Sequence, residues 1–481
     1  MNYTLLGAVL AYEVIVIVGL GLWLQRRRDA TAKDEFALAR RSLSMPVVAV
    51  TLALTVLGGP HILGVFEMAW ILGAAAVWFS LAHVILLVVV CLGTGVWLRR
   101  IGVATVPQLL QMSYGIETRL LVSCVMAGVL FGILTVEAQG IGIIFASLTD
   151  WDIPTGAVVG GVLGILYVIL AGINEIGVVN LVNAVVMYVG LILAVIVVAL
   201  NLPGRNFDSV EQFYLSAEQA HMLSIFGNTE IMMTFVLGTL VAVIFSQGIN
   251  QMLLQPAMAA KDDKTIMRAL WIAAPVNGLF GVFAVVLGLT AKSIPEFQAL
   301  GQKVAATSML VAYLPNWLAA ILLAAFLAAI LSTFAMISLA IATIFSHDIY
   351  RNLYRPDADE RRMTLVMRIV IVLVAGTATG VASFLPPILA AMNWLFAWLV
   401  PVFWVLVFGL FWRCNQRVAI TTLLASWIAN SVWSFSDLPV WLGMAGTPNA
   451  FVTVFVAIGI LVVGNLVRPG RPGFLNRSAA G

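Results

Sequence analysis

Residues that could do chemistry stand out in this sequence because they interrupt long apolar runs. In TVLGGPHILGVFE, residues 55–67, two glycines and a proline precede His61 and Glu67. Glycine weakens a helix, and proline lacks an N–H and clashes with the carbonyl four residues earlier. Such backbone persists in hydrocarbon only inside protein or beside a water-filled cavity, so the stretch is either a proline kink or a discontinuous helix that forms a binding site. The second interpretation makes Gly58, Gly59, His61 and Glu67 candidate solute-binding residues.

A second polar interruption favours the discontinuous helix. FSQGINQ, residues 245–251, places Gly248 among four hydrogen-bonding side chains inside another apolar run. The two interruptions fall in the second and seventh predicted membrane spans, five helices apart. Transporters built from inverted five-helix repeats place their broken helices at such matching positions. The candidate solute-binding residues here are Ser246, Gln247, Asn250 and Gln251.

Two other features offer ligands at membrane depth. Glu137, in LTVEAQGIG, is a lone intramembrane carboxyl. Such a group either binds solute or carries a proton in transport, or it forms a structural hydrogen bond to a neighbouring helix. Ser332 and Thr333 are adjacent in an alanine-rich run. Their hydroxyls either donate to carbonyls one turn earlier or supply oxygen ligands to a small hard cation.

The composition shows whether the chain lies in water or in a lipid bilayer. Of its 481 residues, 62% are hydrophobic and only 10% are charged, and the mean hydropathy is +1.06. Roughly a quarter of the residues in soluble domains are charged, so most of this chain lies in a bilayer. Runs of roughly 20 apolar residues, long enough to cross the hydrocarbon core, recur throughout. We predict an all-α polytopic membrane protein with thirteen spans, at residues 3–24, 46–73, 75–98, 117–147, 154–171, 177–201, 228–255, 268–291, 314–346, 364–386, 388–412, 418–436 and 449–467.

The distribution of basic residues predicts the orientation. With the N-terminus outside and the C-terminus inside, only Arg205, Lys292 and Lys303 of the 25 lysines and arginines fall outside, as the positive-inside rule requires. The first span is too long for a signal-peptide core, so we expect a retained helix. The net charge of +3 therefore reflects topology and indicates no nucleic-acid partner. We expect a multi-pass protein of the plasma membrane, of the bacterial inner-membrane type.

The sequence carries no motif of an enzyme or a cofactor site. Its three cysteines, Cys91, Cys124 and Cys414, lie far apart and its four histidines are scattered, so neither a disulfide framework nor a metal cluster is indicated. Phosphate loops and nucleophile–base pairs are also missing. We expect a single transporter domain over residues 1–481, with core repeats at about 46–201 and 228–412 and peripheral helices at 3–24, 418–436 and 449–467.

Four segments together resemble the sodium/solute symporter family. NQMLLQPAMAAKDDK (250–264) is similar to the family segment that has NQ followed by QR and LAAK, and residues 323–350 resemble its alanine-rich helix with paired hydroxyls that ends in Asp-Ile-Tyr. ATVPQLLQMSYG (104–115) resembles its cytoplasmic TLPE…RYG loop, and AGINEIGVVNLVNAVV (171–186) resembles its GG…TD helix. The resemblance implies a LeuT-type core of two inverted five-helix repeats, helices 2–6 and 7–11.

The resemblance also implies where the two ligands bind. The family's sodium site joins carbonyls before the first break to a carbonyl and two hydroxyls of the ninth span, which correspond here to Leu54, Leu57, Ala329, Ser332 and Thr333. The solute sits beside the breaks, and His61 occupies a solute-contacting position where sugar-binding members have glutamine. Residues 55–67 look most like the choline-transporter branch, but Val56 stands where that branch has a cage tryptophan.

We therefore expect a secondary active transporter that couples sodium to the movement of a small organic solute by alternating access. Its partners are the solute, the sodium ion and the lipid bilayer, and it needs no cofactor besides sodium as the coupling ion. Two alternatives stay open at this point. One is a proton-coupled transporter that uses Glu137, and the other is a sensor that binds solute without transporting it.

The sixth predicted span leads to a prediction for stoichiometry. Relatives with a second sodium site use an aspartate of this span, and that position is Asn180 here. An amide brings no negative charge, so a second buried cation lacks compensation in low dielectric, and we expect Asn180 instead to bind Ser332, Thr333 or a nearby backbone group. We predict one sodium per solute, measured as a reversal potential in proteoliposomes, and a higher ratio in Asn180→Asp. A ratio of two in the unaltered protein contradicts this prediction.

Overall fold

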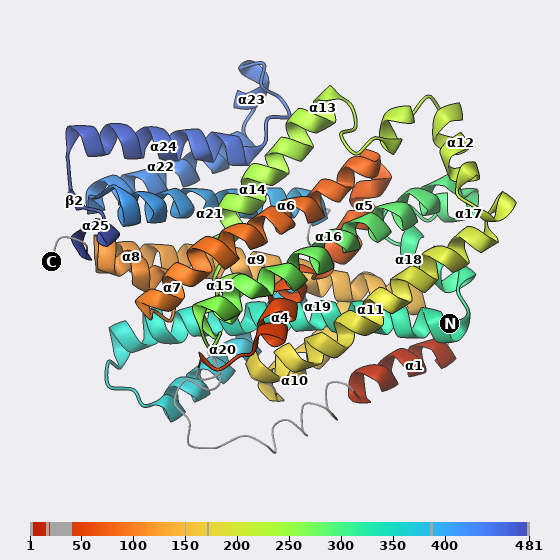
Figure 1. Ribbon diagram of the computed structural model, residues 1–481, viewed down its shortest axis with the longest axis horizontal. Coiled ribbons are helices and arrows are strands. Elements are labelled where there is room, and N and C mark those ends of the chain that lie inside the picture. The colour runs from red at the N-terminus through yellow and green to blue at the C-terminus, as the bar shows by residue number, and fades with distance from the viewer. Residues whose placement is uncertain are drawn as a thin grey trace.

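Two interrupted helices lie within a bundle of long helices that run roughly side by side (Figure 1). The computed structural model describes residues 3–15, 19, 41–149, 151–170, 173–384 and 388–478. Among these residues, ten helices are long and apolar enough to cross a membrane, and three shorter apolar helices accompany them. An all-helical membrane protein is therefore confirmed, while the count of thirteen crossings and the orientation stay predictions.

The first half of the chain contains the first interrupted helix, whose parts are α4 (Met45–Val56) and α5 (Gly59–Leu72). A short turn, η3 (Gly73–Ala76), leads into α6 (Val77–Val89), which continues through η4 (Val90–Thr94) into α7 (Gly95–Ile101). The helices that follow are α8 (Val106–Tyr114), α9 (Ile116–Leu148), α10 (Ile153–Leu170) and α11 (Ile173–Asn201).

The second half contains the other interrupted helix. Its first part runs through α13 (Thr229–Ile231), η7 (Met232–Val236) and α14 (Leu237–Gln247), and its second part is α15 (Gln251–Met258). The helices that follow are α16 (Asp263–Ser293), α19 (Asn316–Ile344) with its extension η8 (Phe345–Tyr354), α20 (Glu360–Val381) and α21 (Ile388–Phe411).

Peripheral helices and short connecting elements complete the chain. The helices predicted to be peripheral are α1 (Tyr3–Glu13), α22 (Gln416–Phe435) and α24 (Asn449–Val467). The connectors hold α12 (Asp208–Ser216), α17 (Pro295–Gln298), α18 (Ala305–Tyr313), α23 (Leu438–Trp441) and α25 (Phe474–Ser478). Two short strands, β1 (Arg413–Cys414) and β2 (Arg471–Pro472), pair antiparallel. The described helices match the predicted spans to within a few residues, but positions 16–18 and 20–24 of the first span and 171 and 385–386 of later spans lie outside the described residues.

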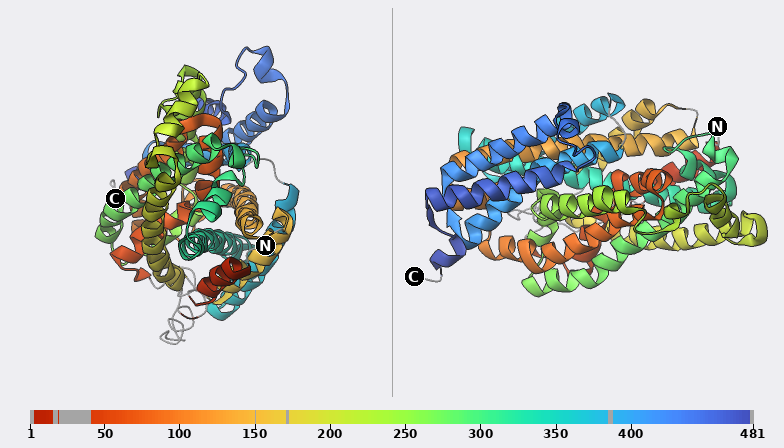
Figure 2. Two further views of the ribbon diagram at one scale, coloured as in Figure 1. Left: turned by 90° about the vertical axis from the view of Figure 1, so that its right-hand side faces the viewer. Right: turned by 90° about the horizontal axis from the view of Figure 1, so that it is seen from above.

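α19 is the central helix of the bundle, as the end-on view in Figure 2 helps to show. Its most apolar window is 94% buried inside the protein, against 28% for the peripheral α24. It packs against α1, α4, α9, α10, α11 and α20. Its many alanines allow these helices to approach closely, as small residues do at membrane helix interfaces. Ser332 and Thr333 lie on this helix and are therefore surrounded by protein.

Glycines bring α5 and α9 together beside the first interruption. A Cβ on Gly140 of α9 would lie 3.0 Å from the Gly59 Cα, and a Cβ on Gly59 would lie 3.4 Å from the Gly140 Cα. A Cβ on Gly58 would overlap a carboxylate oxygen of Glu137. The Gly-Gly pair is therefore required by packing as well as by the break, because it makes room for this carboxylate.

This contact predicts that Gly140→Val is destabilising. The added methyl groups force α9 away from the α5 backbone, and overpacking of this kind costs about 1–3 kcal/mol of unfolding free energy. Thermal unfolding of the purified protein in detergent measures the loss. Gly128→Val is the matched control on the same helix, because a Cβ at Gly128 meets nothing within 4 Å. Equal melting temperatures for the two variants would contradict the prediction.

Candidate sodium and solute site

The first interruption frees a backbone carbonyl inside the bundle. α4 ends at Val56, and the Leu57 N–H still donates to the Ala53 carbonyl over 3.2 Å. The N–H groups of His61 and Ile62 both donate to the Gly58 carbonyl, over 3.0 and 2.8 Å. In a regular helix the His61 N–H would bind the Leu57 carbonyl, which therefore lies outside both hydrogen-bond ladders. The predicted discontinuous helix is confirmed.

Four of the five predicted sodium ligands are joined by hydrogen bonds. The Thr333 hydroxyl donates to the Leu54 carbonyl over 2.9 Å and to the Ala329 carbonyl over 3.1 Å. The Ser332 hydroxyl donates to the Ala329 carbonyl over 2.8 Å. The group contains only oxygen ligands, which is the type that small hard cations prefer. The fifth candidate, Leu57, lies three residues after Leu54 at the break.

Glu137 lies at the beginning of α5. Its Oε2 accepts a hydrogen bond of 2.6 Å from the Gly59 N–H, the first residue of that helix. The side chain is 1% exposed. A carboxylate is stabilised at a helix N-terminus by the free N–H groups and the helix dipole. Glu137 therefore caps the half-helix from α9, and it also lines the cavity between the two breaks.

The second interruption separates the four residues predicted there. Asn250 is the N-cap of α15, because its Oδ1 accepts from the Met252 N–H over 3.2 Å, and its Nδ2 donates to the Gln247 Oε1 over 2.9 Å. Gln251 instead binds the beginning of α8, where it accepts from the Val106 N–H and donates to the Ala104 carbonyl just before that helix.

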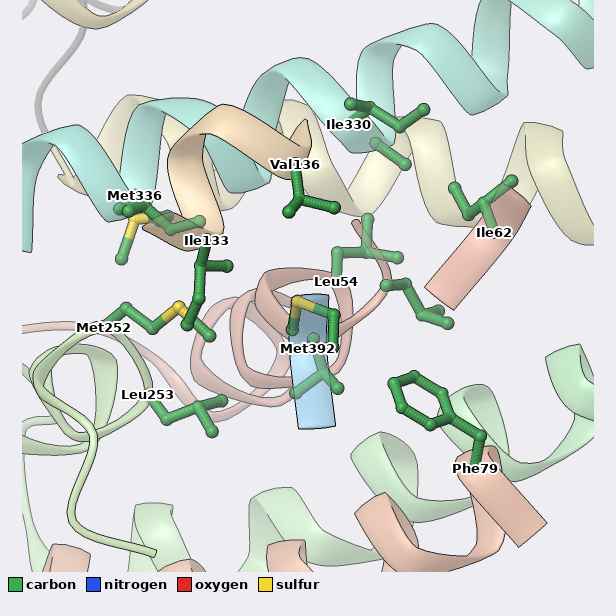
Figure 3. Close-up of a cluster of buried hydrophobic side chains, with 14 of the residues drawn as sticks. Leu54, Ile62, Phe79, Ile133, Val136, Met252, Leu253, Ile330, Met336 and Met392 are labelled. Carbon is green, nitrogen blue, oxygen red and sulfur yellow. The ribbon is translucent and has the colours of Figure 1, made fainter. Parts of the chain in front are cut away.

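A small cavity of about 20 Å³ lies between the two breaks. Its polar lining consists of Thr55, His83, Glu137, Gln247 and Thr333. Its apolar lining includes Phe79, Ile133, Met252, Met392 and Phe396. Figure 3 shows the labelled members of this apolar group gathered around the end of α4 at Leu54. Thr333 and Glu137 therefore bring the candidate sodium and solute sites to one cavity.

Several predicted solute-binding residues lie away from this lining. Among the residues that line the described cavity, the second break contributes only Gln247 and Met252, so Asn250, Gln251 and Ser246 take other positions. Ser246 is fully buried, and its hydroxyl has no hydrogen-bond partner in the described structure. Which residues of a broken helix face its cavity depends on how each half is rotated, and sequence spacing alone does not determine this rotation.

His61 is not part of the described cavity lining and packs against residues that are. Its Nε2 lies 2.6 Å from the Ser80 hydroxyl, and its ring lies 5.0 Å from the ring of His83 and 5.1 Å from that of Phe79. His83 and Phe79 line the cavity, and His61 lies behind them against α16 through Phe280. A direct contact between His61 and solute is therefore not supported by this arrangement.

Glu67 belongs to the other end of α5. Its Oε1 accepts a hydrogen bond of 3.0 Å from Gln302, in the connector between α17 and α18. The side chain is buried, but it is not part of the described cavity lining. Glu67 thus holds the connector against α5, and its predicted role beside the solute is not supported.

His83 is the functional candidate that the sequence interpretation missed. Its Nδ1 lies 2.6 Å from the Phe79 carbonyl, one turn earlier on α6, and the side chain is buried. The signal that could have found it is the one used for Glu137, an ionisable group inside an apolar span. It was missed because no helix breaker lies close to it.

Asn180 does not make the bond that we expected. It is fully buried, and neither its amide oxygen nor its nitrogen has a partner in the described structure. Ser332 and Thr333 donate to carbonyls of α19 and α4 instead. The expected amide link to these hydroxyls is therefore wrong.

The profile of the Sodium:solute symporter family matches residues 36–426, most of the chain. The chain belongs to this family. The symporter is 28% identical to the Sodium/pantothenate symporter of Escherichia coli (strain K12), with 90% of this chain and 91% of that protein covered. It is 26% identical to the "Uncharacterized symporter YidK" of the same organism, with 96% and 83% covered, and 23% identical to the Sodium/glucose cotransporter of Vibrio parahaemolyticus, with 87% and 83% covered.

The fold of the symporter is similar to that of solved transporters. A Na⁺-coupled sialic acid symporter in a substrate-bound outward-open state superposes with a TM-score of 0.80, at 16% identity and 97% coverage of both chains. Mhp1, a nucleobase-cation-symport-1 family transporter, gives a TM-score of 0.56. The expected LeuT-type fold is confirmed, and the chain is a sodium-coupled symporter of a small solute in a bacterial-type inner membrane. The relatives are transporters, so the alternatives of a sensor and of proton coupling alone are no longer favoured.

One end of the symporter is closed by a buried ion pair. Asp348, in η8, accepts hydrogen bonds from Arg119 Nε over 2.7 Å and from the Thr105 hydroxyl over 2.9 Å. The side chains of Arg119 and Asp348 are 8% and 0% exposed. The pair joins α9 to the end of α19, and by the predicted orientation it lies on the cytoplasmic side.

Backbone contacts reinforce this closure. The Leu43 N–H donates to the Ala259 carbonyl over 3.0 Å, and the Lys261 N–H donates to the Leu43 carbonyl over 3.2 Å. Arg99 donates from Nε to the Ala260 carbonyl over 2.8 Å and pairs with Asp263. The segment before α4 is therefore bound to the segment after α15, so that the two broken helices are joined at this end.

The opposite end of the symporter has a larger hollow of about 830 Å³. Gly132 of α9 and Ala391 of α21 line this hollow, and the next residues along the chain, Ile133 and Met392, line the small cavity. α9 and α21 therefore separate the hollow from the candidate site by one layer of side chains. By the predicted orientation, the buried ion pair lies toward the cytoplasm, and this hollow is a vestibule on the outer side.

The buried ion pair predicts that Asp348→Asn lowers the stability of the closed form. Removing one partner leaves the Arg119 charge buried and uncompensated, which costs about 3–5 kcal/mol. Thermal unfolding in detergent measures the effect, and Asp357→Asn is the control because Asp357 is exposed. An Asp348→Asn protein that melts like the control would contradict the assignment.

Proposed function

We propose that sodium binds at Leu54, Leu57, Ala329, Ser332 and Thr333, and that the solute binds in the adjoining cavity between the two breaks. The observation that carries this proposal is the bond of 2.9 Å from the Thr333 hydroxyl to the Leu54 carbonyl. It joins the central helix α19 to the last turn of α4, where the interruption frees the Leu57 carbonyl. A cation that takes both hydroxyls and the carbonyls as ligands would hold these two helices together.

Sodium binding at this position supports solute binding through the broken helix. α4 and α5 meet at Gly58, and Glu137 holds the beginning of α5. With α4 fixed to α19, the two halves of the helix are held in one relative orientation, and the cavity keeps the shape that solute requires. A ligand that binds only this orientation increases its population, which is how sodium and solute increase each other's affinity.

Alternating access then requires the two ends to open in turn. Solute and sodium enter from the outer vestibule past α9 and α21, and release inward requires the bonds of Asp348 with Arg119 and Thr105 to break. The membrane potential favours inward movement by about 2.3 kcal/mol per elementary charge per 100 mV. Because no bond is made or broken in the solute, the reaction is transport.

A stoichiometry of one sodium per solute agrees with the environment of Asn180. Its amide is buried without a described partner, and it adds no negative charge. A second cation beside it would lack a compensating carboxylate from this residue. We therefore propose that the coupling sodium ion binds at this one site.

The proposed sodium site predicts that Ser332→Ala and Thr333→Ala each raise the sodium concentration needed for half-maximal uptake, by at least about tenfold if one ligand contributes 1.4 kcal/mol. Each change removes one oxygen at a depth where water does not readily replace it. Uptake of a transported solute into proteoliposomes against sodium concentration measures the effect. Ser338→Ala is the matched control, because its buried hydroxyl lies on the same helix and donates to the Phe334 carbonyl. Sodium curves that are the same in all three variants and in the unaltered protein would disprove the site.

A further inference from the structure

Glu137 of the symporter lies at the N-terminus of the half-helix α5. In transporters with broken helices, this is a position where an anionic group of the solute can bind. The N-terminus of a half-helix attracts anions through its free N–H groups and its dipole. Here the Gly59 N–H donates to Glu137 Oε2 over 2.6 Å, and the overlap of a Cβ at Gly58 with Glu137 shows that the carboxylate fills the space at the break. A solute carboxylate at this position would meet the oxygens of Glu137 and compete with them for the Gly59 N–H, so anionic solutes are disfavoured.

Two other polar groups of the cavity define which hydrogen bonds a solute can make. The Phe79 carbonyl can only accept, so the His83 Nδ1 at 2.6 Å carries the proton, and the Nε2 of the neutral ring is an acceptor. Glu137 is a second acceptor. Both side chains line the cavity, which therefore favours a solute that donates hydrogen bonds.

The cavity also holds polar atoms without partners. Gln247 is 1% exposed and its Nε2 has no partner in the described structure, while the buried Thr55 hydroxyl is likewise unpartnered. Both residues line the cavity. Buried polar groups without partners are costly, and a ligand that supplies partners is the usual explanation. Both groups are independent of the helix terminus. The Thr55 hydroxyl can accept from a solute N–H and so agrees with a donating solute, whereas Gln247 Nε2 is a donor and gains no partner from an N–H group.

The remaining lining restricts the rest of the solute to a small apolar body. Phe79 and Phe396 offer aromatic faces, and Met252 and Met392 offer polarisable side chains. Neither lysine nor arginine is among the residues that line the described cavity. A protonated amine can donate to the oxygens of Glu137 and lie against the aromatic faces, whereas a polyol would leave hydroxyls against apolar walls without partners. A volume of about 20 Å³ holds about one water, so the lining must move outward even for a small solute.

We infer that the solute is a small organic cation that carries N–H donors, such as a protonated amine with a short apolar chain, and that Glu137 and His83 select it. The inference rests on the proposed location of the solute site. A quaternary ammonium has the charge but no N–H, so it satisfies neither acceptor. A zwitterionic amino acid brings a carboxylate for which the described lining offers no cation of its own.

The test measures how far four small probes raise the melting temperature of the full-length symporter in detergent. The probes share a three-carbon chain, and each is measured in sodium buffer and in potassium buffer. The probes are n-propylammonium, n-propyltrimethylammonium, propane-1,2-diol and propionate. Stabilisation of the native state reports binding. We expect n-propylammonium to stabilise at a concentration at least tenfold lower than each of the other probes, and Glu137→Gln to remove this preference. Glu117→Gln, an exposed carboxylate on the same helix, should keep it.

The four probes measured on the unaltered protein are sufficient to test the inference, even if the Glu137→Gln variant does not fold. Preference for propionate, the diol or the quaternary ion, or no response to n-propylammonium in a protein that still melts cooperatively, would overturn it. A Glu137→Gln variant that folds and keeps the preference would also overturn it. Failure of the proposed function gives a different result, because sodium would then leave the stabilisation by every probe unchanged. The order in which the probes stabilise the protein is measured in both buffers and tests the inference separately.

Discussion

The hydrogen bond between the Gly59 N–H and Glu137 is the interaction on which the site depends. A helix broken inside a membrane exposes N–H groups that water cannot reach, and a carboxyl buried there needs donors. The Gly59 N–H supplies the donor that the Glu137 carboxyl needs, and the carboxyl supplies the acceptor that the N–H needs. The bond requires α9 to approach α5 backbone to backbone, which explains Gly58, Gly59 and Gly140 together. It also places a polar group in a cavity with otherwise mainly apolar walls.

A second constraint comes from the burial of α19. Hydroxyls on a helix surrounded by protein must bind something, and Ser332 and Thr333 donate to carbonyls of their own helix and of α4. These bonds satisfy the hydroxyls without a cation, and the same oxygens would be ligands in the proposed sodium site. The hydroxyls therefore have partners before a cation binds, which suits a site that must load and unload in each cycle.

The sequence predicts those features of the structure that depend on neighbouring residues alone. Apolar runs and helix breakers predicted the long helices and both interruptions, since hydropathy and the chemistry of glycine and proline act over a few residues. The oxygen ligands of the proposed sodium site come from a family resemblance, and the contact between Thr333 and Leu54 agrees with them. The orientations of His61 and Gln251 could not be predicted, because the rotation of each half-helix depends on tertiary packing. His83 lacked a neighbouring breaker, and the environment of Asn180 depends on how other helices pack against α11.

The small volume of the central cavity bears on how faithfully the symporter couples its ions. Protons hop along continuous files of water, and hydrated cations travel in them. A cavity of about 20 Å³ leaves little room for such a file beside the candidate site, and the buried pair of Asp348 and Arg119 packs across one end of the bundle. The tight packing that makes the solute displace its surroundings on entry therefore also works against leakage of ions through the resting protein.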